Sequence, residues 1–248
     1  MRRIIIAFLT VTLTGCDGQQ PRSRSDTESG AASDSRADID ARVESAGRSG
    51  GSTEAPAAGA AGRDDARTIL FVGTSLTAGY GVGADNAYPA VIQQKIDSAG
   101  LPYRVVNAGI SGETSAGGLR RIEWSLQQPA DVLVLELGAN DALRGLDPGQ
   151  MRDNLDAILA RARALHPGIA IVIVGMEAPP NLGDDYTRRF RSVFRDLARK
   201  YDAALVPFLL EGVAAVPELN IADGMHPNEE GHRVLAAVVW PVLAETLR

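Results

Sequence analysis

Three residues in two polar segments of the chain could together cleave an acyl bond. Ser75 lies in the segment GTSLTAGYG, and near the C-terminus Asp223 and His226 form an Asp-x-x-His pair. A three-residue spacing within a turn lets the carboxylate reach the imidazole, fix its tautomer and favour the imidazolium. An imidazole held in this way can take the proton of a serine hydroxyl, so these residue types indicate a serine nucleophile for acyl transfer.

Two further segments could stabilise the negative charge that acyl transfer creates on oxygen. The loop NAGISGET contains Gly109 and Gly112, and glycines let the backbone approach a ligand closely. The segment ELGAND contains Asn140, whose side-chain amide can donate a hydrogen bond, which a carboxylate cannot do. Nucleophile, base, orienting acid and oxyanion donors are the parts that an acyl-transfer site requires.

Each segment also has a purely structural interpretation. The Ser75 hydroxyl and the Asn140 amide are suited to capping a helix or a turn, and the Asp-His pair could lie in an exposed loop. Ser75 does not stand in a G-x-S-x-G elbow, and no Gly-Lys-Ser/Thr follows it as in a phosphate loop. A metal site built from Asp223, His226 and His232 lacks a convincing ligand set. The order and placement of the segments decide between these interpretations.

The elements that must position these residues alternate between strand and helix. Apolar runs with the length of buried strands occur at 68–73, 103–108, 131–137, 169–175 and 204–208. Helix-period segments lie at 88–99, 115–126, 148–165, 184–201 and 229–247. Strands that are apolar throughout and alternate with helices predict an α/β fold with a five-stranded parallel sheet covered on both faces. Ligands bind such sheets beyond the carboxyl ends of the strands, where the polar segments fall.

Taken together, the four segments make residues 68–248 similar to the SGNH, or GDSL, hydrolase family, and most of all to its bacterial arylesterase, thioesterase and lysophospholipase subgroup. The resemblance implies a three-layer α/β/α sandwich of flavodoxin-like topology. It also implies the roles of five residues. Ser75 is the nucleophile, Asp223 and His226 activate it, and the oxyanion hole comprises Ser75, Gly112 and Asn140. In one departure, Thr74 replaces the aspartate of the usual Gly-Asp-Ser-Leu motif; we expect activity to survive, because threonine still forms hydrogen bonds.

The activity implied by this resemblance is that of a serine esterase acting on aryl or short- to medium-chain acyl esters, with thioesters or lysophospholipids as further substrates. A polysaccharide O-acetylesterase is an alternative within the enzymes. A catalytically silent binding module of the cell envelope is the alternative outside them. No cofactor or metal is expected, because the chain has only one cysteine and three histidines. The net charge of −6, with no basic cluster, disfavours nucleic acid as a partner. We expect a monomer.

The N-terminus carries a predicted export signal followed by a predicted disordered tether. Residues 1–16 place two arginines before a short apolar stretch and end in LTGC, which resembles a bacterial lipobox with Cys16 as the lipid attachment site. Several acyl chains on Cys16 would anchor the protein stably in a membrane. Residues 17–67 are rich in Ser, Gly, Ala, Asp and Arg, a composition typical of a disordered tether. We therefore expect an exported envelope lipoprotein that faces the periplasm, with the choice of membrane left open.

Overall fold

The computed structural model describes residues 66–248. The predicted signal peptide, Cys16 and almost all of the predicted tether lie outside the described residues. Five strands form one sheet, β1 (Arg67–Gly73), β2 (Tyr103–Gly109), β3 (Val132–Glu136), β4 (Ala170–Val174) and β5 (Ala204–Val206). Their order is β2-β1-β3-β4-β5, and every neighbouring pair is parallel. The predicted five-stranded parallel sheet is therefore confirmed, with strand ends that differ by at most two residues from the apolar runs.

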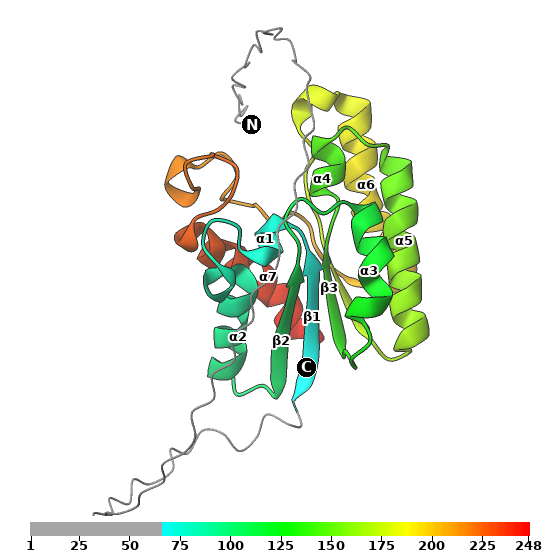
Figure 1. Cartoon of the computed structure of the whole chain (residues 1–248), viewed down its shortest axis with the longest axis vertical. Helices are drawn as coiled ribbons and strands as arrows, with labels where there is room; N and C mark the ends of the chain where they lie inside the picture. The colour runs from blue at the N-terminus through cyan, green and yellow to red at the C-terminus, as the bar shows by residue number, and fades with distance from the viewer. Residues whose placement is uncertain (1–65) are drawn as a thin grey trace, which may run out of the picture. The chain divides into compact units, whose positions relative to one another are not determined.

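Five long helices cover the two faces of the sheet (Figure 1). They are α2 (Tyr88–Ser98), α3 (Ser115–Ser125), α5 (Pro148–Leu165), α6 (Asp184–Tyr201) and α7 (Glu229–Thr246). Helices α2 and α7 pack against each other on one face, while α5 lies between α3 and α6 on the other. This arrangement confirms the predicted three layers. Within residues 66–248, none of the helices is both long enough and apolar enough to cross a membrane.

Several one-turn elements were not expected. They are the helices α1 (Ser75–Ala78) and α4 (Ala139–Leu143) and the 3₁₀ turns η1 (Ala84–Asn86), η2 (Pro180–Leu182) and η3 (Pro217–Leu219). An element of three to five residues is too short to display the helical period from which longer helices are predicted. Two of them matter for function, because α1 begins with Ser75 and α4 contains Asn140.

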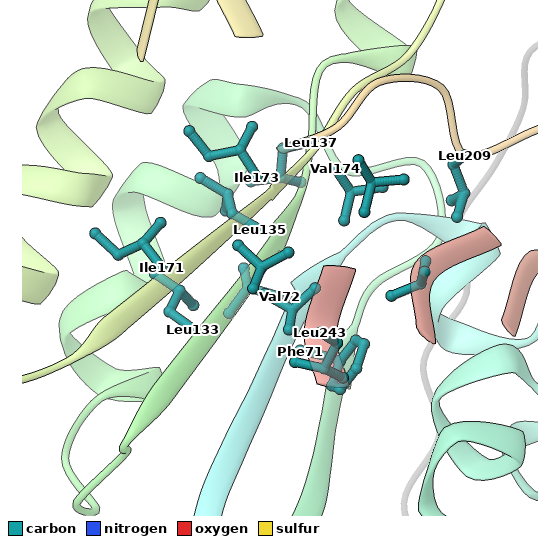
Figure 2. Packing of buried hydrophobic residues seen from close by; sticks show 14 of the residues in the cluster. Phe71, Val72, Leu133, Leu135, Leu137, Ile171, Ile173, Val174, Leu209 and Leu243 are labelled. Atoms are coloured by element: carbon teal, nitrogen blue, oxygen red, sulfur yellow. The ribbon is translucent and has the colours of Figure 1, made fainter. Parts of the chain in front are cut away.

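The core explains why the central strands are mostly apolar. In β1, all residues after Arg67 are buried, and all five residues of β3 are buried. Figure 2 shows aliphatic side chains of β1, β3 and β4 packed along the sheet, and Phe71 of β1 and Leu243 of α7 belong to the same buried cluster. On the same face Phe71 meets Tyr88 of α2 edge to face, with ring centroids 5.7 Å apart. Because both faces of the sheet are covered, the central strands have few positions that face water.

The strand register places the starts of the polar loops next to one another at the carboxyl edge of the sheet. At the carboxyl edge, Gly73 of β1 pairs with Gly109 of β2 on one side and with Glu136 of β3 on the other. The loops that leave these three strands therefore start next to one another. Thr114 caps α3 by accepting the N–H of Gly117, so the loop after β2 leads directly into a helix.

The other end of the sheet holds both ends of the described domain. Arg67, the first residue of β1, pairs with Tyr103, the first residue of β2. The Tyr103 hydroxyl donates a hydrogen bond to the carbonyl of Leu247, just after α7, at 3.4 Å. The C-terminus accordingly lies near the foot of β1 (Figure 1), away from the loops at the carboxyl edge.

Candidate active site

Ser75, His226 and Asp223 form a continuous chain of polar contacts. His226 Nε2 lies 3.0 Å from Ser75 Oγ, across 151 positions of the sequence. On its other side, His226 Nδ1 lies 2.6 Å from Asp223 Oδ2. The second carboxylate oxygen of Asp223 accepts the backbone N–H groups of Met225 and His226, each at 2.9 Å. Because Asp223 is held by its own turn, it fixes the imidazole with one nitrogen directed at the serine hydroxyl.

The surroundings of Asp223 favour its ionised form. Burial raises the pKa of Asp223, but hydrogen bonds from the backbone N–H groups of His226 and Met225, and then from the imidazole, hold this pKa below its usual value. The side chain of His226 is 21% exposed. The half-exposed ring of Tyr80 leans against it, with ring centroids 4.6 Å apart and planes inclined by 46°. The imidazole is therefore confined between Asp223, Ser75 and Tyr80.

The turn that carries Ser75 is held in place by the hydrogen bonds of Thr74, the residue before it. Thr74 precedes α1, and its side-chain oxygen accepts the N–H of Leu76 at 3.4 Å. The same hydroxyl and the Thr74 N–H both contact the buried carboxylate of Glu136. Thr74 thus forms hydrogen bonds in the place of the family's aspartate, as expected from its residue type.

Donor groups suited to an oxyanion lie on the two neighbouring loops and on the serine itself. The N–H groups of Ser75 and Gly112 have no hydrogen-bond acceptor within residues 66–248. Gly112 has a φ of +77°, which a side chain would strain. The Asn140 amide donates one hydrogen bond to the Glu113 carbonyl at 3.0 Å, which leaves its second N–H for another acceptor. Each of the three expected donors therefore has a hydrogen left for a further acceptor.

Polar contacts cross-link the loops that carry these donors. The guanidinium of Arg144 donates to the Gly112 carbonyl at 2.9 Å. The buried Asp141, next to Asn140, accepts the N–H of Ser115 at 2.8 Å and also its hydroxyl. On the other side, the Ile110 N–H donates to the Gly73 carbonyl at 2.9 Å, which joins the second loop to the nucleophile turn. The sequence alone did not identify Arg144 or Asp141 as supports, because their partners come from a separate loop.

Sequence reasoning also missed Glu136 and Tyr80. The only available signal for Glu136 is a charged residue near the end of the otherwise apolar run 132–137, a position where carboxylates are rarely buried without partners. Tyr80 follows the serine turn without any periodic pattern to indicate its direction. His232, by contrast, is a buried packing residue, whose Nδ1 accepts the Tyr88 N–H at 3.2 Å.

A carboxylate, imidazole and hydroxyl in contact at the carboxyl edge of a parallel sheet define a serine hydrolase. Comparison with known proteins assigns the chain to one family of such hydrolases. The chain belongs to the GDSL-like lipase/acylhydrolase family, whose model matches residues 71–234. The predicted family and fold are thereby confirmed.

Named relatives cover most of the globular part. Esterase TesA of Pseudomonas aeruginosa strain PAO1 is 42% identical over 184 residues, which is 73% of this chain and 90% of that protein. The arylesterase of Vibrio mimicus is 33% identical over 72% of this chain and 89% of its own length. Thioesterase 1/protease 1/lysophospholipase L1 of Escherichia coli K12 is 39% identical over 69% and 80%. A crystal structure of TesA, 40% identical, matches 73% of this chain and 100% of that chain with a TM-score of 0.69. With this family and these contacts, the chain is a carboxylic ester hydrolase.

Proposed function

We propose that this protein hydrolyses carboxylic esters with aryl or short- to medium-chain acyl groups, through an acyl-enzyme on Ser75. The observation that carries the proposal is the pair of contacts made by His226, at 3.0 Å to Ser75 Oγ and 2.6 Å to Asp223 Oδ2. Both lie in the hydrogen-bonding range expected for a base and its orienting acid.

The reaction starts with the transfer of the Ser75 proton to His226 as the serine oxygen attacks the ester carbonyl. Asp223 holds the ring and stabilises its positive charge. The carbonyl oxygen becomes an oxyanion, which accepts hydrogen bonds from the N–H groups of Ser75 and Gly112 and from the Asn140 amide. The carbon–oxygen bond to the leaving group then breaks, and His226 returns the proton to the departing oxygen. Water attacks the acyl-enzyme by the same steps and releases the acid.

Two observations favour aryl esters among the possible substrates. The half-exposed ring of Tyr80 adjoins His226, the residue that delivers the proton to the leaving group, and so offers an aromatic surface at that point. One relative is named an arylesterase. The name of another relative extends the proposal to thioesters and lysophospholipids. An O-acetylesterase for polysaccharides stays an alternative, tested by the same panel of substrates.

The decisive experiment compares the wild-type protein with Ser75→Ala. The wild type should label with a fluorophosphonate probe and hydrolyse 4-nitrophenyl acetate, whereas Ser75→Ala should do neither while keeping its circular dichroism spectrum. A wild type that neither labels nor turns over would indicate a silent binding module. Full turnover by Ser75→Ala would overturn the role of the serine. Rates on aryl acetates, longer acyl esters, acyl-CoA, lysophospholipid and acetylated glycan then rank the substrates.

We also propose that the protein is a periplasmic lipoprotein attached through Cys16. Support comes from the sequence, where two arginines, a short apolar stretch and the only cysteine follow one another in the order of a lipoprotein signal. Cys16→Ser should move the protein from the membrane pellet to the soluble fraction without changing its specific activity. Continued pelleting of that variant would contradict lipidation.

A further inference from the structure

A buried carboxylate lies directly under the nucleophile turn and takes no part in the proposed chemistry. Glu136, the last residue of β3, is 1% exposed. Its oxygens accept the Thr74 N–H at 2.9 Å and the Thr74 hydroxyl at 3.0 Å. They also accept the Thr77 hydroxyl at 2.8 Å. Because these donors stand before and after Ser75 in the chain, one carboxylate ties down both sides of the serine turn.

The packing around this carboxylate leaves no room for adjustment. A Cβ atom on Gly73 would lie 2.0 Å from Thr77 Oγ1 and 2.7 Å from Glu136 Oε2, so only glycine fits between the strand and the turn. The Tyr88 hydroxyl lies 2.9 Å from Thr77 Oγ1. When Glu136 is ionised, Thr77 gives its hydrogen to the carboxylate, so the Tyr88 hydroxyl donates to the threonine oxygen. The direction of each hydrogen bond in the cluster is thus set by the carboxylate.

The partners of Glu136 also distinguish it from an ion pair. All of its hydrogen-bond donors are neutral groups of Thr74 and Thr77, and none of the twelve ion pairs within residues 66–248 includes it. A charged group buried without a cation costs stability, which apolar side chains of similar size would avoid. Its contacts are concentrated on the turn that presents Ser75.

We propose that Glu136 is a positioning residue, which holds Ser75 Oγ against His226 and directs the Ser75 N–H towards the oxyanion without touching the substrate. The inference rests on the proposed role of Ser75 as nucleophile. A displacement of the reacting oxygen by about 1 Å is enough to lower the rate on the order of 10²-fold. Loss of Glu136 should therefore lower kcat, whereas substrate binding, which uses other groups, should change little.

The test is the variant Glu136→Gln in the full chain, assayed with 4-nitrophenyl acetate. Glutamine keeps the size and one acceptor oxygen, but it places an NH₂ group where threonine hydroxyls now donate. We expect kcat to fall about 10- to 100-fold, with KM within about threefold of the wild type. Thr77→Val, which removes one of the donors, should lower kcat less. Its effect should not add to that of Glu136→Gln, because both changes break the same contact.

Tyr88→Phe is the matched control. It removes a buried hydroxyl from the same cluster but leaves every contact of the carboxylate in place, so kcat should stay within about threefold of the wild type. Wild-type kcat in folded Glu136→Gln would overturn the proposal, and so would an equal loss in Tyr88→Phe. If Glu136→Gln does not fold, unchanged kcat in Thr77→Val overturns it instead. An active Ser75→Ala would refute the proposed function itself, whatever the Glu136 variants do.

Discussion

Two buried titratable groups should make opposite contributions to the pH dependence of folding stability. Burial raises the pKa of Glu136 from 4.5 to about 7, although hydrogen bonds from Thr74 and Thr77 oppose the shift. Burial, and next to it the charge of His226, lowers the pKa of His232 from 6.5 to about 4. Folding therefore favours the neutral form of both side chains.

The signs follow from which state binds more protons. Between pH 4.5 and 7 the folded state holds the Glu136 proton more tightly, so this contribution is complete at low pH and is lost as the pH rises. Between pH 4 and 6.5 the unfolded state protonates His232 more readily, so this contribution is lost as the pH falls. Each shift corresponds to about 3 kcal/mol. Between pH 4.5 and 6.5 the two contributions change in opposite directions by nearly equal amounts. Together they therefore leave the wild-type free energy of unfolding almost independent of pH.

The substitution Glu136→Gln removes the pH dependence contributed by Glu136 and leaves that of His232 unopposed. Its free energy of unfolding should rise by about 2 kcal/mol from pH 4.5 to 6.5, relative to the change in the wild type over the same interval. Urea unfolding of the full chain, followed by circular dichroism at several pH values, measures this difference. Glu245→Gln, a change at an exposed carboxylate, should follow the wild-type curve. Parallel curves for Glu136→Gln and the wild type would refute the reasoning.

Three other substitutions probe the site and its support. Asp223→Asn should lower kcat for 4-nitrophenyl acetate on the order of 10³- to 10⁴-fold, because the imidazole loses its orienting carboxylate; a loss below tenfold would contradict that role. Asn140→Ala should lower kcat on the order of 10²–10³-fold without unfolding, as circular dichroism can verify. Gly109→Ala would place a Cβ 2.3 Å from the Ala78 nitrogen, so urea unfolding should give a loss of about 1–3 kcal/mol. Gly168→Ala, which meets nothing within 4 Å, serves as its control and should stay close to the wild type.

The sequence predicts the sheet well because a parallel sheet covered on both faces requires apolar residues at most positions of its central strands, as at 132–135. It also predicts that Ser75, Asp223 and His226 come together, since their loops follow strands of one sheet. It does not predict contacts between loops. That Asn140 donates to the Glu113 carbonyl, or that Thr74 reaches Glu136, depends on strand order and register, which local patterns do not encode.

The meeting of both domain ends at the foot of the sheet has a practical consequence. Because Arg67 pairs with Tyr103 and Tyr103 contacts Leu247, the two ends can be joined by a short linker without stretching the fold. The enzyme is thus a natural candidate for circular permutation, with new ends opened in an exposed surface loop. It can equally be immobilised on a bead or displayed on a phage through either end, with the catalytic edge left facing the substrate solution.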